Sequence, residues 1–439
     1  MKIAIIMGNY EKQGFPPLGI LSLAAYLEQY NPTVETEVYD IFPDEQTLLE
    51  NNPDIVAFSA LSVQYPAVSK YAKHLRQHYE GLICVGGVHI SLTRVLPDWA
   101  DIGMIGEGEE TISEMVACLE TDSYEKLATV RGLIIRIRGN DIFTGNRSYI
   151  RNLDTIPYPA FHKIDMSFYL LENNVYGTTV GRGLSIITSR GCAFHCDYCS
   201  ASEMWHTIRY HSAEYIIGEI VYLIENYQIE HVWIADDHFA TNYKRLDEMS
   251  SLLDKYGIHI GIGINMRVDA YNNRIAKIFQ KLGVRSIAFG LETGSNRLLR
   301  QIKNRQNLTV EKESRIVKQA ANDGFEIHGM FMLNIPGETR EELYETINMI
   351  KKLPLAKCSI SIATPFYGTK WWDIAIAEGI VPKKPTDDYW CTYSMKTLEK
   401  NRPIFRNEVS REELMKIYTD INVYCRDLFY FDWRSRGNK

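Results

Sequence analysis

The sequence lacks the features that mark membrane-spanning, secreted and nucleic-acid-binding proteins. It contains no run of about 18 uninterrupted apolar residues, the length that a helix needs to cross a bilayer. The apolar run at residues 3–7 is too short for a signal peptide, and no cleavage pattern follows it. Lys and Arg total 48 against 55 Asp and Glu, and the net charge of -7 provides no basic surface for nucleic acid or an anionic membrane. We therefore expect a cytoplasmic protein with a small-molecule or peptide substrate.

The eight cysteines also lack the spacing of a disulfide framework. Five are scattered, and because free cysteine is usually a small buried apolar residue, we expect that role for all five. The scattered residues are Cys84, Cys118, Cys358, Cys391 and Cys425. The other three lie close together in the pattern Cys192-x-x-x-Cys196-x-x-Cys199, directly after an apolar run at residues 184–188 that predicts a buried strand.

The clustered cysteines indicate a metal centre. Thiolates are soft ligands that bind zinc and iron-sulfur clusters. A tetrahedral zinc site needs a fourth protein ligand, but the sequence has no second Cys-x-x-Cys or histidine pair, and His195 is poorly placed to close a site with its own neighbours. The loop therefore favours a 4Fe-4S cluster with Cys192, Cys196 and Cys199 as metal ligands and one iron left open.

The first part of the chain alternates short strands with amphipathic helices, and 439 residues are too many for one ordinary core. For residues 1–145 this alternation predicts a doubly wound, Rossmann-like α/β domain, whose ligand lies beyond the carboxyl ends of the strands. Strands are expected at residues 3–7, 36–39, 55–59, 82–85, 104–105 and 131–137, and helices at residues 18–29, 67–78 and 110–120.

Four turns at those carboxyl ends are rich in glycine and small polar residues. Glycine lets the backbone approach a ligand closely, and nearby helix N-termini accept polar or anionic groups. Each glycine alone is explained by ordinary turn geometry, but four such turns on one edge predict a binding crevice. The candidate residues are Gly14, Pro17, Leu18, Ser59, Ser62, Gly86, Gly87, Gly106, Glu107, Gly108 and Glu109.

After a predicted linker at residues 146–180, six further strand-helix units occupy residues 181–380. Six units predict a partial (β/α)6 barrel of the TIM type, with its functional mouth at the carboxyl ends of the strands. The strands are expected at residues 184–188, 231–235, 259–264, 286–290, 326–333 and 357–363. Residues 381–439 are predicted to form a short helical C-terminal segment.

Charged side chains follow three of the barrel strands. Asp236 and Asp237 come after the second strand, Arg267 after the third and Glu292 after the fourth. A solvated loop, a surface salt bridge and a structural carboxylate are the alternatives for these positions. Because the carboxyl ends of parallel strands meet at one edge, we expect the four side chains to lie at one mouth.

Cys358 and Tyr367 are the candidates for a direct catalytic role, because both are expected near the same mouth. Either side chain is able to donate a hydrogen atom or to shape a substrate pocket. A buried filler cysteine and a packing tyrosine are the alternatives.

The cysteine loop, with Tyr198 before its third cysteine, resembles the signature of the radical S-adenosylmethionine (SAM) superfamily. The resemblance implies that SAM chelates the open iron through its amino and carboxylate groups. It implies further that one electron from the cluster cleaves SAM to methionine and a 5'-deoxyadenosyl radical, and that an external flavodoxin- or ferredoxin-like protein supplies this electron. The residues that the resemblance assigns to SAM are Tyr198, Asp236, Asp237, Arg267 and Glu292.

The N-terminal half carries a second resemblance. Residues 17–27, 54–62, 85–89 and 106–109 are similar to the cobalamin-binding domain of B12-dependent radical SAM proteins, a group that includes the class B methyltransferases. Many cobalamin domains supply a lower-axial histidine from an Asp-x-His-x-x-Gly sequence, but this chain has residues 9–14, Asn-Tyr-Glu-Lys-Gln-Gly, at that place. The resemblance therefore implies cobalamin without a histidine ligand to cobalt.

Methylation of an unactivated carbon is the reaction that the resemblance implies first. The same architecture also serves radical cyclisation, ring contraction and rearrangement. A hypothesis from a different class is an iron-sulfur electron-transfer module without SAM cleavage. Such a module has no need of Asp236, Arg267 and Glu292 at one mouth, so the sequence disfavours it.

Overall fold

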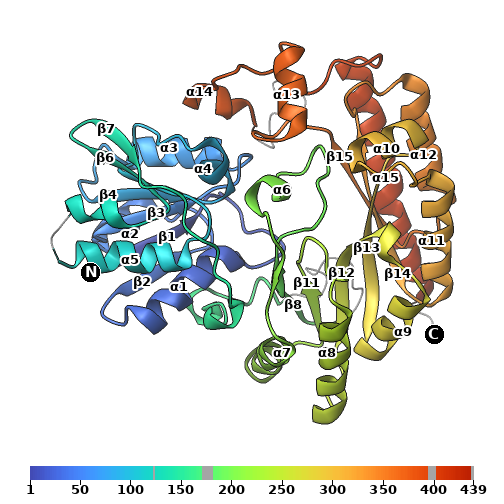
Figure 1. Cartoon of the computed structure of the whole chain (residues 1–439), viewed down its shortest axis with the longest axis horizontal. Coiled ribbons are helices and arrows are strands. Elements are labelled where there is room, and N and C mark those ends of the chain that lie inside the picture. Colours follow the sequence, from blue (N-terminus) through green and yellow to red (C-terminus); the bar gives the residue numbers. More distant parts are fainter. Residues whose placement is uncertain (122–123, 171–180, 394–401, 437–439) are drawn as a thin grey trace. The chain divides into compact units, whose positions relative to one another are not determined.

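The computed structural model describes residues 1–121, 124–170, 181–393 and 402–436 (Figure 1). The side chains of Cys391 and of residues 427–436 lie outside this description, and so does the predicted role of Cys391. The chain forms two compact units. The N-terminal unit comprises Met1–Phe168 and Pro382–Arg402, and the barrel unit comprises Tyr169–Val381 and Pro403–Lys439. Within the described residues, no helix combines the length and the hydropathy needed to cross a membrane.

The N-terminal unit is built on a seven-stranded sheet. Its strands lie in the order β2 (Glu35–Tyr39), β1 (Lys2–Met7), β3 (Ile55–Ser59), β4 (Leu82–Gly86), β5 (Ile102–Met104), β6 (Leu133–Ile137) and β7 (Asn140–Phe143). The first five run parallel, whereas β6 and β7 are antiparallel to their neighbours. The chain passes from β1 outward to β2 and then returns to β3 on the other side of β1. A doubly wound sheet binds its ligand beyond the carboxyl ends at such a reversal.

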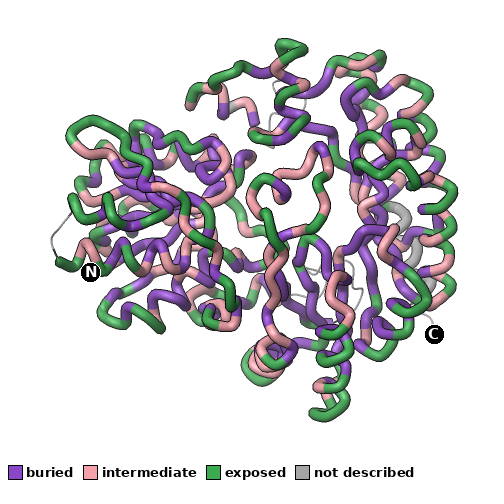
Figure 2. Tube along the Cα trace, in the orientation of Figure 1, coloured by how far each residue is buried: buried purple, intermediate pink, exposed green. Residues whose placement is uncertain are grey.

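The predicted doubly wound sheet is confirmed, but two of its helices were not predicted. Helices α1 (Leu18–Tyr30), α3 (Tyr65–Leu75) and α5 (Glu109–Leu119) match predicted ones, but the sequence does not predict α2 (Glu45–Glu50) and α4 (Val88–Thr93). Each of these two has only 6 residues, which is too short for a helical periodicity to be recognised in the sequence. Buried residues follow the strands of both sheets (Figure 2), as expected of parallel sheets that are covered on both faces.

The barrel unit contains six parallel strands in the order of the chain. They are β8 (Gly183–Ile186), β11 (His231–Ile234), β12 (Gly261–Arg267), β13 (Val284–Glu292), β14 (Glu326–Leu333) and β15 (Lys357–Ile362). The helices between them are the short α6 (Ala201–Met204) and the longer α7 (Ala213–Tyr227), α8 (Tyr243–Tyr256), α9 (Asn273–Leu282), α10 (Asn296–Lys303), α11 (Val310–Asn322) and α12 (Arg340–Lys352). The predicted partial barrel is confirmed. Because β12 and β13 run further than predicted, Arg267 and Glu292 end their strands and do not lie in the loops that follow.

The predicted C-terminal segment, residues 381–439, is divided between the two units. Asp387 begins α14 (Asp387–Trp390) and accepts hydrogen bonds from the hydroxyls of Tyr65 at 2.5 Å and Ser69 at 2.8 Å, both on α3. These bonds fasten this stretch to the N-terminal unit. Helix α15 (Arg411–Arg436) packs against β15 instead. Of the predicted linker, residues up to Phe168 belong to the N-terminal unit, and residues 171–180 lie outside the described part.

Two of the scattered cysteines are not free. Cys358 on β15 and Cys425 on α15 form a disulfide whose Cα atoms lie 5.5 Å apart. The prediction that both are free was wrong, because 67 residues separate them and no sequence pattern shows that this strand and this helix meet. Cys358 therefore has no thiol that donates a hydrogen atom. Cys84 is free and buried as expected, whereas Cys118 is free but only half-buried.

Candidate cofactor site

The clustered cysteines lie on the loop that follows β8 and the short strand β9 (Ser189–Arg190). Cys192, Cys196 and Cys199 are free and half-buried. The loop begins at Gly191, whose φ is 103°. A Cβ atom at this position would lie 2.4 Å from the carbonyl oxygen of Thr207, so a larger residue would displace the backbone.

Asp197 anchors this loop to the barrel, and it is a residue that the sequence motifs do not single out. Its backbone N–H donates to the Ile302 carbonyl at 3.0 Å. Its buried carboxylate accepts hydrogen bonds from Asn304 and Lys370, both at 2.8 Å, and Asn304 also donates to the His195 carbonyl at 2.6 Å. The loop is therefore held from two barrel segments that are remote in the sequence.

Arg267 is brought directly to the cysteine loop. Its guanidinium donates to Cys196 Sγ at 3.4 Å and lies over the Phe194 ring, 4.1 Å from the ring centre. Two further N–H groups bind the Asp269 carboxylate at 2.9 and 3.0 Å. Burial raises the pKa of the Cys196 thiol, and the positive charge of Arg267 opposes that rise. This fixed cation favours thiolate at Cys196 and offers a partner for an anionic ligand.

The two consecutive aspartates have different surroundings. Asp236 is 1% exposed, and its carboxylate accepts four hydrogen bonds. Thr188 donates its N–H and its hydroxyl, both at 2.6 Å, and Ser189 donates its N–H at 3.0 Å and its hydroxyl at 2.6 Å. These bonds occupy the acceptor sites of the carboxylate, so Asp236 fixes the chain that leads into the cysteine loop.

Asp237 is exposed and lies near two of the cysteines. Burial raises the pKa of Cys199 to about 11, and the Asp237 carboxylate acts in the same direction. The pKa of Cys192 is likewise raised, first by burial and then by Asp237. Of the aspartate pair, Asp237 is thus the one that is open to a ligand beside the loop.

Glu292 connects the end of β13 to the loop. It is 9% exposed and has a φ of 72°, in the left-handed region. Its Oε1 accepts a hydrogen bond from the Tyr198 hydroxyl at 2.8 Å, so two predicted SAM contacts touch each other. Burial raises the pKa of Glu292, whereas Lys303, Tyr198 and Arg267 lower it.

A buried ion pair lies beside Glu292. Lys303 is 4% exposed and donates to the Gly290 carbonyl at 2.7 Å and to Glu313 Oε1 at 2.8 Å. Glu313 is fully buried, which raises its pKa to about 7, and Lys303 opposes this rise. The sequence holds one signal for the pair: Lys303 stands four residues after Leu299, on the apolar face of α10.

In the N-terminal unit, the loops after β3 and β4 lie against each other. The Ala60 N–H donates to the Gly86 carbonyl at 3.1 Å, and the His89 N–H donates to the Ala60 carbonyl at 3.2 Å. At Gly87, with φ 92° and ψ -175°, a Cβ atom would lie 2.7 Å from the Ala60 carbonyl oxygen. This contact requires glycine.

The predicted crevice residues differ in their surroundings. Glu107 and Glu109 are buried and bind within the unit, where they accept hydrogen bonds from the Ile150 N–H at 2.8 Å and the Ser22 hydroxyl at 3.1 Å. By contrast, a Cβ atom at Gly106 would meet nothing within 4 Å. Of the remaining candidates, Ser59 and Gly86 end β3 and β4, and Leu18 begins α1. The others lie on the loops after β1, β3, β4 and β5 and are Gly14, Pro17, Ser62, Gly87 and Gly108.

Large apolar side chains are exposed on two of these loops. Tyr10 and Phe15 follow β1 and are 52% and 51% exposed, and Leu61 follows β3 and is 43% exposed. Exposed apolar groups on these loops, together with the open space at Gly106, suit a large ligand with apolar faces. The residues present therefore fit a cofactor of that kind.

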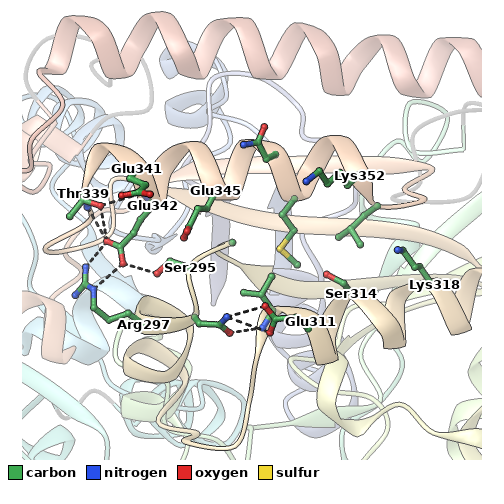
Figure 3. A pocket seen from close by; sticks show the side chains of 16 residues that line it. Ser295, Arg297, Glu311, Ser314, Lys318, Thr339, Glu341, Glu342, Glu345 and Lys352 are labelled. Carbon is green, nitrogen blue, oxygen red and sulfur yellow. Dashed lines mark hydrogen bonds and ion pairs between the residues drawn. The ribbon is translucent and has the colours of Figure 1, made fainter.

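Tyr367 and a surface groove are two further features of the barrel unit. Tyr367, which follows β15, is half-buried and packs with its ring centre 5.2 Å from that of Trp372. A groove of about 730 Å³ runs along α10, α11 and α12 (Figure 3). Polar groups in this groove bind one another, as in the pair of Arg297 with Glu342, and none of the predicted site residues line it.

Two protein-family models match segments of this chain. Residues 186–350 match the model of the Radical SAM superfamily, and residues 5–116 match the B12 binding domain. An uncharacterized methyltransferase of Pyrococcus horikoshii is 29% identical over 426 residues, which cover 94% of this chain and 90% of the relative. An anaerobic magnesium-protoporphyrin IX monomethyl ester cyclase of Cereibacter sphaeroides is 25% identical over 100% of this chain and 72% of the relative.

A solved structure has the same fold. The radical SAM methyltransferase TsrM from Kitasatospora setae matches with a TM-score of 0.68 and 16% sequence identity. The match covers 86% of this chain and 75% of that chain. It therefore extends over most of both units.

Proposed function

Because the chain belongs to the radical SAM proteins that also contain a B12-binding domain, we propose that it is a cobalamin-dependent radical SAM enzyme that methylates an unactivated carbon. One observation carries the proposal: three half-buried cysteines share a loop with Tyr198, and Arg267 and Glu292 contact that loop from two strand ends. Three thiolates with charged groups beside them suit a cluster whose open iron takes a zwitterionic ligand.

The residues of the loop fit a 4Fe-4S cluster and SAM. Cys192, Cys196 and Cys199 would hold the cluster. When bound, the cluster supplies the electron that cleaves SAM, and cobalamin supplies the methyl group. Arg267 would pair with the carboxylate of SAM, and the exposed carboxylate of Asp237 would accept a hydrogen bond from its amino group. Glu292, oriented by Tyr198, would contact the ribose or amino acid portion, and Asp236 positions the loop.

The glycine loops of the N-terminal unit would hold cobalamin, without a protein ligand to cobalt. The loop after β1 contains no histidine. His89, the second residue of α4, is 2% exposed and stacks on Tyr65 with the ring centres 3.9 Å apart. Its Nδ1 lies 3.2 Å from the Ser62 hydroxyl, and burial lowers its pKa to about 3. His89 is thus committed to the packing of the loops.

Radical cyclisation, ring contraction or rearrangement is the second candidate function. It is favoured by the similarity to the magnesium-protoporphyrin ester cyclase, which extends over 100% of this chain. For either reaction we propose a small-molecule or peptide substrate and an external flavodoxin- or ferredoxin-like reductant.

The proposal is tested with the full-length chain reconstituted anaerobically with iron, sulfide and cobalamin. After reduction and addition of SAM that carries a labelled methyl group, 5'-deoxyadenosine and label on the corrinoid are measured. We expect both. An intact cluster that yields no 5'-deoxyadenosine and no labelled corrinoid would overturn the proposal and favour an electron-transfer module. 5'-Deoxyadenosine with an unlabelled bound corrinoid would favour cyclisation or rearrangement over methyl transfer.

A further inference from the structure

A cluster of metal-binding side chains lies on the surface of the N-terminal unit, outside the loops assigned to cobalamin. We propose that Glu45, His74 and His78 form a zinc site that joins the start of α2 to the end of α3. The proposal is independent of the radical SAM function.

The three side chains converge from two segments. Glu45 is the first residue of α2, and His74 lies in the last turn of α3. His78 lies in the turn that follows α3, where its N–H donates to the Leu75 carbonyl at 3.0 Å. One ligand atom from each residue lies within 4.8 Å of those of the other two, and His74 Nε2 is 3.1 Å from Glu45 Oε2. A simple ion pair between His74 and Glu45 would not require His78 at the same point. The turn after α3 brings the His78 ring to the His74 ring, with the ring centres 5.7 Å apart.

Packing around the cluster fixes the carboxylate next to the histidines. Tyr71, on α3, donates its hydroxyl to the Pro43 carbonyl at 3.0 Å, and its ring stacks on Phe42 with the centres 4.6 Å apart. Phe42 and Pro43 directly precede α2, and Asp44 caps that helix by accepting a hydrogen bond from the Thr47 N–H at 3.2 Å. Glu45 is therefore held beside His74, which follows Tyr71 on α3, before any metal binds.

The ligand types select the metal. Imidazole nitrogens suit zinc, copper and nickel, whereas calcium and magnesium prefer sites made of oxygen ligands. Two histidines and one glutamate form a three-ligand zinc set that water completes to a tetrahedron. His74 and His78 are exposed, so zinc is able to enter from solvent without rearrangement of the core. Bound zinc would tie together two helices that in its absence share one His–Glu contact at this point.

Zinc binding is measured by calorimetric titration of the full-length chain with zinc chloride. Cys192, Cys196 and Cys199 are replaced by alanine in every protein compared, because free thiolates would compete for the metal. The test variant adds His74→Ala and His78→Ala. The matched control adds His162→Ala, because His162 is also exposed and its Nε2 also lies 3.1 Å from a glutamate oxygen, Glu28 Oε1. Circular dichroism verifies that each variant is folded.

We expect one zinc per chain in the control, and at least about tenfold weaker binding in the double histidine variant. Glu45→Ala alone should also weaken binding, because it removes one of three ligands. Zinc should raise the unfolding temperature of the control but not of the double variant. Equal zinc affinity in the control and the double histidine variant would overturn the site, and unchanged affinity in Glu45→Ala would overturn the three-ligand assignment.

Discussion

At the carboxyl edge of the barrel sheet, buried charged side chains surround the cysteine loop, whereas at the carboxyl edge of the N-terminal sheet the loops combine glycine with exposed apolar residues. In the first region, which we call the barrel edge, Arg267, Lys303 and Glu313 are each at most 9% exposed. In the second, the N-terminal edge, Gly87 and Ala60 are in backbone contact and Leu61 is exposed. The barrel edge is organised by side-chain charge, and the N-terminal edge by backbone shape.

This difference corresponds to the two ligands that we propose. SAM carries a carboxylate, an ammonium and a sulfonium group, so fixed charges orient it. Cobalamin is large and has broad apolar surfaces, so close backbone approach and exposed apolar groups hold it. Substitutions at the barrel edge should therefore change charge-dependent properties, and substitutions at the N-terminal edge should change steric fit.

The largest effect is expected for Cys196→Ala. This change removes one of three thiolate ligands, so the reconstituted protein should lose its 4Fe-4S cluster and with it all 5'-deoxyadenosine formation. Iron and sulfide content and the visible spectrum are the measurements. Cys118→Ala is the matched control, because Cys118 is also free and half-buried but lies on α5. A full cluster in Cys196→Ala would contradict the ligand assignment.

Lys303→Met tests the role of buried charge at the barrel edge. The loss of the cation leaves Glu313 unpaired, and breaking a buried pair costs about 3 to 5 kcal/mol of unfolding free energy. Lys303 lowers the pKa of Glu292, so its removal raises that pKa and Glu292 becomes protonated at higher pH. The acid limb of the pH dependence of SAM affinity, where affinity falls as Glu292 is protonated, should consequently move to higher pH.

The double variant Lys303→Met, Glu313→Leu separates these two effects. It should recover stability, because no unpaired charge is left in the core, but the acid limb should stay displaced, because the cation beside Glu292 is still missing. Denaturant unfolding and SAM titration at several pH values provide the measurements. An acid limb at the wild-type pH in both variants would show that Lys303 does not act on Glu292.

Gly87→Ala is the corresponding test of the N-terminal edge. A Cβ atom there would clash with the Ala60 carbonyl, and the backbone conformation is one that essentially only glycine adopts. We therefore expect the unfolding free energy to fall by about 2 kcal/mol and cobalamin to bind more weakly. Gly19→Ala is the control. Its Cβ would meet nothing within 4 Å, and the position lies in α1, where alanine should add up to about 1 kcal/mol. Equal stability in the two variants would contradict the steric account.

Tyr198→Phe should give the smallest effect. The variant loses the hydrogen bond to Glu292, worth about 1 kcal/mol, but keeps the ring contact with Trp371, whose centre lies 5.4 Å away. The pKa of Glu292 should rise, and SAM should bind about 3- to 10-fold more weakly at neutral pH with the cluster intact. SAM affinity at pH 6 and pH 8 checks this expectation, and a loss that is independent of pH would point to packing instead.

The sequence predicts the architecture well, because parallel strands buried on both faces leave continuous apolar runs that their flanking turns delimit. It also identifies the cysteine loop, since all three thiols lie within one short segment. For the Lys303–Glu313 pair it gives only the position of Lys303 on the apolar face of α10. It does not predict the anchoring of Asp197 by Lys370, because that contact joins segments that are brought together only by folding. For the same reason it misses the disulfide between Cys358 and Cys425.

The roles of Asp236 and Asp237 were also beyond sequence analysis. Adjacent identical residues carry no information on which carboxylate turns inward. The structure resolves the pair, because Asp236 binds four donors of Thr188 and Ser189 while Asp237 is exposed. The hydrogen bonds of Thr188 and Ser189 therefore determine which of the two carboxylates is buried.

The most direct test of the central claim, that the three-cysteine loop holds a cluster whose open iron binds SAM, is electron paramagnetic resonance of the reduced, reconstituted protein with and without SAM. Our account predicts a 4Fe-4S signal that changes when SAM is added and that is absent in Cys196→Ala. An intact 4Fe-4S signal that stays unchanged at saturating SAM would contradict it.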